Sequence, residues 1–302
     1  MIKKTLYFGN PAYLSTKQAQ VVINLPDAEG PPRTIPIEDV GIVVLDNRQI
    51  TITQALMDRL LANNCAIITC DAAHMPAGLF MPLNGNTLQS ERFRAQIDCS
   101  KPLKKQLWQQ TVQAKIANQA SALDRCVPGC ETGNMRAWVN EVRSDDSMNL
   151  EGRAAAYYWR NFFPGQTDDF KRDRDAGGVN TLLNYGYAIL RAVVARALVG
   201  SGLLPTLGIH HHNRYNAYCL ADDVMEPYRP FVDVVVKNIV NEHGEPAELT
   251  TALKRELLSI PVIDVTISRK KRPLMVAAEI TTASLAKCYM GETRRIAYPT
   301  LQ

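Results

Sequence analysis

The stretch Asn84–Thr87 (NGNT) decides the architecture, because the sequence pattern differs on its two sides. A cluster of asparagine, glycine and threonine is typical of a turn between structural units. Before it, short runs rich in β-branched residues predict strands. After it, apolar residues recur about every four positions and predict helices. The sequence therefore predicts an α+β protein: a β-rich N-terminal domain over residues 1–85, followed by a larger, all-α-helical C-terminal domain over residues 86–302.

The N-terminal part predicts a small sheet covered by one helix. Each expected strand is short, apolar and bounded by Gly, Pro, Asn or Asp. The expected strands are Lys4–Phe8, Gln20–Leu25, Thr34–Ile37, Val40–Leu45 and Cys65–Thr69, with a helix over Gln54–Asn64.

The C-terminal part predicts six helices and one long polar loop. Apolar periodicity and capping residues place these elements. The expected helices run from Arg92 to about Leu123, from the capping residues Asp145–Ser147 to about Phe163, and over Asn180–Val199, Ala217–Glu226, Ala247–Leu258 and Ala277–Tyr289; the polar loop is Gln166–Val179.

Composition indicates a soluble protein with no membrane association. Hydrophobic residues make up 46% and charged residues 21% of the 302 residues. The most apolar stretch, Tyr185–Val199, contains Arg191 and Arg196 and therefore predicts a packed helix rather than a membrane span. The N-terminus has no apolar segment typical of a secretory signal, and the seven cysteines form no CxxC pair. We expect a cytoplasmic protein.

Three of the five histidines are consecutive, His210 to His212, shortly after Gly208. Neither a helix nor a strand buries three consecutive side chains, so this run is harder to explain as structural than a single histidine. A solvated loop remains the alternative.

Three acids, Asp222, Asp223 and Glu226, crowd the end of the next expected helix. Glu226 lies three or four positions from the other two and so shares a helix face with each. Pro227 disfavours helical conformation at Glu226 and ends or kinks the helix there. Carboxylates are unfavourable at a helix C-terminus and repel one another, so the cluster indicates a bound cation; a solvated acidic turn is the alternative.

His211 and Glu226 would be about 22 Å apart in one continuous helix, so a shared site needs a chain break around Asn213–Asn216. Glu151 is the candidate third ligand, although an acid in a first helical turn also stabilises the helix dipole. Two carboxylates and one imidazole favour Mg²⁺ or Mn²⁺ over structural Zn²⁺. Such an ion polarises a phosphodiester and orients an attacking hydroxyl.

Other chemistries have no matching motif. The chain contains no Gly-rich P-loop, dinucleotide fingerprint or GxSxG sequence, which argues against nucleotide hydrolysis and acyl transfer. A net charge of +4 permits nucleic-acid binding without requiring it. Several basic side chains are candidates for phosphate contacts, with a solvated charged surface as the alternative. These are Lys104, Lys105, Arg172, Arg174, Arg229, Arg269, Lys270, Lys271 and Arg272.

The same segments resemble one protein family. The resemblance rests on spaced motifs that occur in a fixed order, which is more specific than any one of them. The motifs are Lys115–Gln119 (KIANQ), Glu151-Gly152 with Ala155 and Tyr158, Asn180–Tyr187 (NTLLNYGY), Gly202–Pro205 (GLLP), Leu207–His211 (LGIHH) and Leu220–Pro230 (LADDVMEPYRP). Together they resemble the CRISPR-associated integrase-endonuclease that acquires new spacers, the "Cas-one" family, in its type II versions.

The resemblance implies a β-domain and an α-helical catalytic domain. It places the family's metal ligands on Glu151, His211 and Glu226, with Asp223 and His210 close to the metal. The step of fifteen residues to Glu226 favours His211 over its neighbours. Many members carry Asp where this chain has Glu226, and the longer carboxylate could alter the metal preference.

The resemblance also implies partners. Members form an asymmetric homodimer, which the N-terminal domain is expected to support, and two such dimers bridge a dimer of the smaller "Cas-two" protein in a heterohexamer. The expected substrate is double-stranded DNA, both the prespacer and the CRISPR repeat.

We therefore expect a divalent-metal-dependent DNA integrase and endonuclease, in which a 3′-hydroxyl of a short foreign duplex attacks a phosphodiester of a CRISPR array. Two alternatives remain: a structure-specific metal-dependent nuclease without an integration role, and a noncatalytic DNA-binding scaffold.

Overall fold

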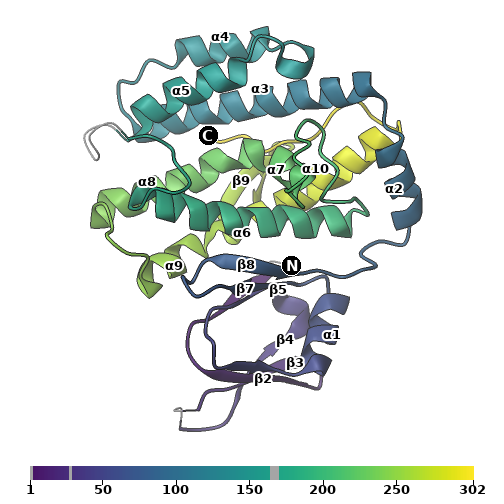
Figure 1. The fold of residues 1–302 in the computed structure, drawn as a ribbon, viewed down its shortest axis with the longest axis vertical. Helices are drawn as coiled ribbons and strands as arrows, with labels where there is room; N and C mark the ends of the chain where they lie inside the picture. Colours follow the sequence, from purple (N-terminus) through teal and green to yellow (C-terminus); the bar gives the residue numbers. More distant parts are fainter. Residues whose placement is uncertain (1–2, 27–28, 164–169) are drawn as a thin grey trace. The chain divides into compact units, whose positions relative to one another are not determined.

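The computed structural model describes residues 3–26, 29–163 and 170–302 (Figure 1). Residues 166–169 of the predicted polar loop lie outside this range. The chain divides into two compact units, Met1–Gly85 and Asn86–Gln302, within the turn cluster Asn84–Thr87.

In its described residues, the first unit contains two four-stranded sheets, one α-helix and one short 3₁₀ helix. In one sheet three strands are parallel and the fourth is antiparallel: β1 (Lys4–Phe8), β5 (Val40–Leu45), β7 (Ala66–Cys70) and β8 (Pro76–Phe80). The other sheet has the order β4 (Arg33–Pro36), β3 (Gln20–Asn24), β2 (Ala12–Lys17) and β6 (Ile50–Ile52). The short helix η1 (Ile37–Asp39) precedes β5, and α1 (Gln54–Ala62) begins after Thr53, whose side chain accepts a hydrogen bond from the Leu56 amide. Helix α1 places Leu56 and Leu60 in the core beside Val43 and Ile67.

The prediction of a single sheet was therefore wrong. Strands β2, β6 and β8 were not predicted, because they are short and carry weak signals: Pro76 and Gly78 in β8 are both residues that usually mark turns. The other five strands and α1 are confirmed within one or two residues.

The second unit is mostly helical and is organised around two long helices. Figure 1 shows α3 with α4 and α5 along one side and α7 and α8 along the other. The elements are α2 (Gln89–Ile97), α3 (Lys101–Cys126), α4 (Gly133–Glu141), η2 (Ser144–Asp146), α5 (Leu150–Phe162), α6 (Val179–Gly200), α7 (Cys219–Met225), η3 (Glu226–Tyr228), α8 (Arg229–His243), α9 (Thr251–Leu257), η4 (Ile260–Val262), β9 (Asp264–Ile267), β10 (Lys270–Pro273) and α10 (Leu274–Tyr289).

Helix α6 confirms the predicted packed helix. By length and composition alone it could cross a membrane, but most of its apolar window is buried within the unit. It packs against α8 and α10. Its apolar character therefore reflects its place in the core.

Three further predictions need correction. The single helix from Arg92 is two helices, because Ser100 caps α3 through the Leu103 amide and Pro102 occupies its first turn. Helices α4 and α8 were not predicted. The C-terminal domain is not all-helical, since β9 and β10 form an antiparallel hairpin. The α+β architecture, with strands first and mostly helices after, is confirmed.

Candidate metal centre

Glu151 lies in the first turn of α5, and the loop before that helix fixes its position. Asp146 accepts hydrogen bonds from the Leu150 amide (2.9 Å) and from the Glu151 amide (2.9 Å). The carboxylate thereby satisfies two amides that a helix start leaves without partners. Gly152 leaves room for the preceding turn, because a Cβ there would lie 2.8 Å from Asn149 Oδ1.

Glu226 lies where α7 gives way to the short helix η3. The predicted end of the helix before Pro227 is confirmed, because α7 ends at Met225 and residues Glu226–Tyr228 form one 3₁₀ turn. The predicted loss of helical conformation at Glu226 is wrong, since its φ of −52° and ψ of −47° are helical. The turn directs Glu226 into the unit, where its side chain is 8% exposed.

Lys115 of α3 joins the two glutamates. Its Nζ lies 2.6 Å from Glu151 Oε1 and 2.6 Å from Glu226 Oε2. On the other side of Glu226, Arg229 Nε lies 2.8 Å from Oε1. Two carboxylates from distant parts of the chain therefore meet on one ammonium group.

The histidine segment is not helical, so the predicted break between His211 and the acids is confirmed. Asp223, fully buried in α7, accepts hydrogen bonds from the His210 amide (2.9 Å) and from His211 Nδ1 (2.5 Å). Gly208 is required here, because a Cβ would collide with the His211 carbonyl oxygen and approach Asp223 Oδ2 at 2.9 Å. Since Nδ1 of His211 is bound to Asp223, its Nε2 is the nitrogen left for a ligand.

Trp108 packs beneath two of the three histidines. Its ring stacks on His210 with centroids 4.3 Å apart. The rings of Trp108 and His211 are nearly perpendicular, with centroids 5.6 Å apart. His212 is exposed and takes part in neither contact. The structure thus singles out His211 as the histidine that an acid orients.

The charges of these groups influence one another. Burial opposes ionisation of Glu226, but the positive charges of Arg229 and Lys115 outweigh it and lower the pKa of Glu226 to about 2. The hydrogen bond that His211 donates to Asp223 raises the pKa of His211 against the effect of burial, and the charges of Asp223, Glu226 and Glu151 add to the rise. Burial lowers the pKa of Lys115, but Glu226 and Glu151 outweigh it and the net shift is upward. Glu226 therefore remains an anion beside the cations Lys115 and Arg229.

Asp222 faces a different partner. It forms a two-pronged ion pair with Arg191 of α6, with Nε to Oδ1 at 2.7 Å and Nη2 to Oδ2 at 3.0 Å. The sequence indicated a bound cation from three crowded acids. The structure shows that the protein itself compensates the charge: Asp222 by Arg191, Asp223 by backbone amides and His211, and Glu226 by Lys115 and Arg229.

Sequence reasoning assigned no role to Lys115, although it belongs to one of the quoted motifs. It lies seven positions after Trp108, on the same face of α3, and both side chains are buried. A lysine on an apolar helix face needs a buried anion, and that was the available signal.

Among the described residues, another group has more closely spaced ligand atoms. Glu242, His243 and Glu256 offer ligand atoms that all lie within 4.8 Å of one another, but Glu242 and His243 are exposed. This exposed cluster was not predicted from the sequence.

The predicted phosphate-binding residues lie in several places. Arg172 and Arg174 line a pocket of about 190 Å³ together with Arg191 and Arg229. Lys105 is paired with Asp145 at 2.9 Å. Lys104 is partly buried in α3.

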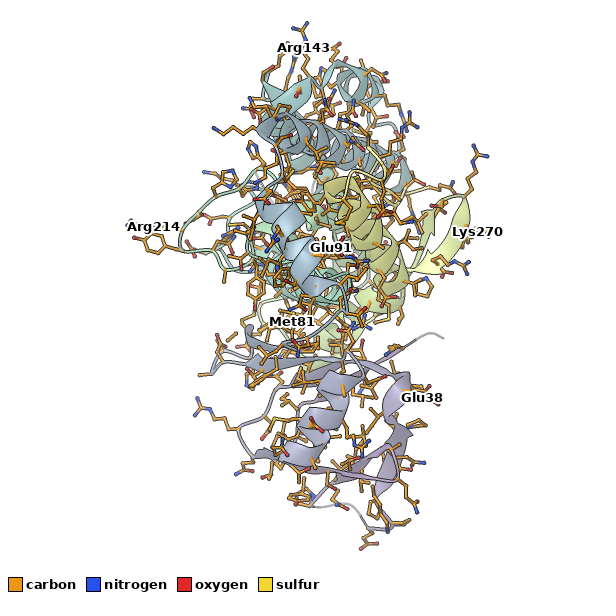
Figure 2. The ribbon with its side chains drawn as sticks, turned by 90° about the vertical axis from the view of Figure 1, so that its right-hand side faces the viewer. Glu38, Met81, Glu91, Arg143, Arg214 and Lys270 are labelled. Carbon is orange, nitrogen blue, oxygen red and sulfur yellow. The ribbon has the colours of Figure 1, made fainter. Side chains whose placement is uncertain are left out.

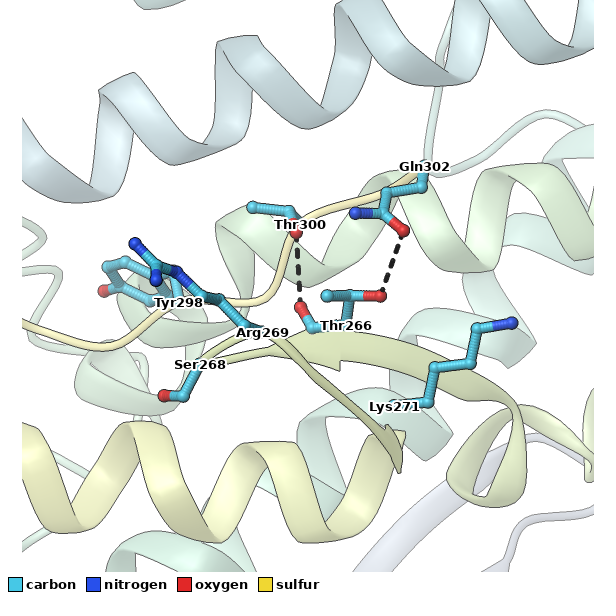
Figure 3. A pocket seen from close by; sticks show the side chains of 7 residues that line it. All are labelled: Thr266, Ser268, Arg269, Lys271, Tyr298, Thr300 and Gln302. Carbon is cyan, nitrogen blue, oxygen red and sulfur yellow. Dashed lines mark hydrogen bonds between the residues drawn. The ribbon is translucent and has the colours of Figure 1, made fainter.

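The remaining basic candidates belong to the β9–β10 hairpin. Figure 2 shows Lys270 projecting from it. Arg269 and Lys271 line a second pocket beside the tail that carries Tyr298 and Thr300 (Figure 3). Arg272 lies in β10 opposite Val265.

Asn118, one turn after Lys115 in α3, links the site to the C-terminal tail. Its Nδ2 donates to the Pro227 carbonyl (2.7 Å) and the Pro299 carbonyl (3.0 Å), and its Oδ1 accepts from the Leu301 amide (3.0 Å). The turn after Glu226 and the tail are thus held by one buried amide.

Comparison with known proteins adds the family. A family model described as CRISPR associated protein Cas1 matches residues 6–252. A CRISPR-associated endonuclease Cas1 from Neisseria meningitidis serogroup C (strain 8013) is 35% identical over 284 residues, covering 94% of this chain and 91% of that protein.

Solved structures share the fold. A casposase bound to integration product matches with a TM-score of 0.78 and 19% identity, covering 98% of this chain and 92% of that one. A chain of a Cas6-RT-Cas1–Cas2 complex matches with a TM-score of 0.72 and 20% identity, covering 97% of this chain and 35% of that one. At such identities the likeness shows the fold alone. The family model and the Neisseria relative establish more, and they confirm the resemblance seen in the motifs: this chain belongs to the CRISPR-associated protein Cas1 family.

Proposed function

We propose that this chain is a divalent-metal-dependent DNA integrase and endonuclease that inserts short foreign DNA duplexes as new spacers into a CRISPR array. One observation supports the proposal above the others: Glu151 of α5 and Glu226 of η3 are held 2.6 Å from the same Lys115 nitrogen. Carboxylates from distant parts of the chain, gathered at one point, are what a metal-dependent phosphoryl-transfer site requires. The Neisseria relative is named an endonuclease, and the casposase structure contains an integration product.

The residues fit Mg²⁺ or Mn²⁺. Glu226 Oε2 is buried and accepts no aligned hydrogen bond from the described residues, and its closest cation is Lys115, while Arg229 contacts the other oxygen, Oε1. Glu151, Glu226 and Nε2 of His211 would hold the ion, with water completing its shell. When bound, the ion supplies Lewis-acid stabilisation of the charge that develops on the phosphate. Asp223 keeps the His211 ring oriented, and Trp108 limits its movement.

The arginine-lined pocket supports a DNA substrate. Arg172, Arg174, Arg191 and Arg229 surround about 190 Å³, and Arg229 also contacts Glu226. Guanidinium groups match phosphate oxygens in a two-pronged geometry, so a backbone phosphate next to the reacting one fits this pocket.

The hairpin residues Arg269, Lys270, Lys271 and Arg272, with Lys104, are proposed as further backbone contacts. Lys105 could contact a phosphate only after breaking its ion pair with Asp145.

The proposed assembly follows the family. The N-terminal domain over residues 1–85 would support a homodimer, and two dimers would bind a Cas2 dimer in a heterohexamer. The structurally similar Cas6-RT-Cas1–Cas2 complex, in which a Cas1 and a Cas2 occur together, supports the pairing with Cas2. We place this assembly in the cytoplasm, without membrane contact.

The test is joining of a labelled duplex to a repeat-containing plasmid, in Mg²⁺ or Mn²⁺ and with Cas2 present. We expect strand transfer that stops on chelation and in separate Glu151→Gln and His211→Ala variants, while each variant still binds DNA. Unchanged transfer in both variants would eliminate the proposed centre. Cleavage of DNA without joining would support a structure-specific nuclease instead. DNA binding with no metal-dependent chemistry in the unmutated protein would support the noncatalytic scaffold.

A further inference from the structure

Lys115 lies between Glu151 and Glu226, the two carboxylates that are proposed to hold the metal ion. Its Nζ makes equal contacts of 2.6 Å with Glu151 and Glu226, and its side chain is 11% exposed. Helix α3 packs against both α5 and η3, so the ammonium is delivered from a rigid element between the two carboxylates. It is an internal cation at the centre of the site.

The local charge shows what the ammonium does. Without it, two carboxylates would face each other, with Glu226 only 8% and Glu151 25% exposed, and only the contact of Arg229 with Oε1 would compensate Glu226 among the described residues. Buried like charges repel strongly in a medium of low dielectric constant. Lys115 therefore stabilises the site by holding both carboxylates in place.

The same ammonium opposes a second cation. Carboxylate oxygens at 2.6 Å from Nζ are already engaged, and a divalent ion beside a buried ammonium is repelled by it. Metal binding through both glutamates therefore requires the ammonium to move away from them.

We propose that Lys115 is a built-in competitor of the divalent ion: it occupies Glu151 and Glu226 before the ion binds, is displaced when the ion enters, and then contacts a phosphate of the DNA. This inference rests on the proposed function. A DNA phosphate stabilises the displaced ammonium, so DNA strengthens metal binding and metal binding strengthens DNA binding by the same factor. The affinity of the site for the divalent ion is therefore highest when DNA is bound.

Metal affinity tests the competition without any measurement of catalysis. All proteins carry Glu256→Gln, which removes a ligand from the exposed cluster of Glu242, His243 and Glu256 and so suppresses Mn²⁺ binding there. Mn²⁺ affinity is then measured by titration calorimetry and by the electron paramagnetic resonance signal of free Mn²⁺. We expect Lys115→Met to bind Mn²⁺ roughly ten- to a hundredfold more tightly than the parent, because one buried positive charge is gone.

Two comparisons complete the titration. Lys115→Arg keeps the charge and should stay close to the parent affinity. A non-reacting duplex should tighten Mn²⁺ binding in the parent and much less in Lys115→Met. Suppose that the parent binds Mn²⁺ and that Glu226→Gln removes this binding. If Lys115→Met then binds Mn²⁺ no more tightly than the parent, the competition is overturned and the proposed function stays intact. If the parent itself shows no Mn²⁺ binding that depends on Glu226, the proposed function fails too.

If Lys115→Met does not fold, displacement of the ammonium can still be tested by NMR on the protein that retains Lys115. In protein labelled with ¹⁵N-lysine, the ammonium resonance of Lys115 is assigned by its loss in Lys115→Arg. Mg²⁺ should shift this resonance and speed its hydrogen exchange, because the ammonium leaves the two carboxylates. An unchanged resonance at saturating Mg²⁺ would contradict displacement.

Discussion

Two buried acids in neighbouring elements, Glu226 of η3 and Asp233 of α8, carry opposite pKa shifts. Glu226 contacts Lys115 and Arg229, and its pKa falls to about 2. Asp233 accepts hydrogen bonds from the hydroxyls of Tyr187 (2.5 Å) and Tyr158 (3.0 Å), and burial raises its pKa to about 7.

The difference teaches that burial alone does not determine the charge of an acid. Desolvation raises the pKa of both groups, and cations at contact distance reverse the outcome at Glu226 only. Tyrosine hydroxyls stabilise the ionised form of Asp233 too weakly to do the same. Glu226 is therefore an anion paired with two cations, whereas Asp233 is held by neutral hydroxyl donors.

The largest expected effect separates the two acids by activity. Glu226→Gln keeps the shape of the side chain and removes its charge, so strand transfer should fall by about a thousandfold, since a metal contributes several kcal/mol to the transition state. Asp233→Asn, the matched neutral substitution, should retain most of the activity. The measurement is the initial rate of joining at saturating Mn²⁺. An equal loss in both variants would indicate damage to the fold around α8 and not a role for the charge of Glu226.

A smaller effect is expected from the acid that orients His211. Asp223→Asn weakens the 2.5 Å hydrogen bond to Nδ1, so Mn²⁺ affinity or the joining rate should fall about ten- to a hundredfold. Asp145→Asn is the control, because Asp145 lies 3.7 Å from the neighbouring His210 and is partly exposed. If the two variants behave alike, Asp223 has no special part in positioning the imidazole.

A third expected effect concerns stability: the pH dependence of the free energy of unfolding has opposite signs at Glu226 and Asp233. The folded-state pKa of Glu226 is lowered from 4.5 to about 2, so its contribution is present above pH 4.5 and is lost as the pH falls toward 2. The folded-state pKa of Asp233 is raised from 3.8 to about 7, so its contribution is present below pH 3.8 and is lost as the pH rises through 7.

Urea unfolding in the presence of a chelator measures both trends. The free-energy difference between the unmutated protein and Glu226→Gln should shrink by a few kcal/mol between pH 5 and about pH 2 to 3. Relative to Asp233→Asn, the unmutated protein should lose stability between about pH 4 and pH 7. Parallel trends in the two comparisons would contradict the opposite shifts.

Local patterns predicted most of the helices, because a buried helix face repeats every three to four residues wherever the helix lies. Helix α6 is confirmed within one residue at each end. The break at Ser100 was missed although Ser100 and Pro102 signal a helix start, since apolar residues continue at the same spacing across it. The β9–β10 hairpin was missed because the charged residues Arg269–Arg272 look like a solvated run.

In the candidate site too, local sequence patterns predicted some features, while features that depend on three-dimensional packing were missed. Glu151, His211 and Glu226 were predicted from motifs, and the structure brings them into one region of the molecule. The role of Lys115 depends on which acids meet α3 in three dimensions, and no local pattern contains that information. The partnership of Asp222 with Arg191 likewise depends on the packing of α6 against α7.

The hydrogen bonds of Asn118 couple the turn at Glu226 to a segment far from it in the sequence. One side-chain amide binds both the Pro227 carbonyl and the segment Pro299–Leu301. Trimming or lengthening that segment would leave a buried donor or acceptor of Asn118 without its partner, and the strain would reach the peptide bond next to Glu226. Variation in the segment Pro299–Leu301 would therefore disturb the backbone that positions Glu226.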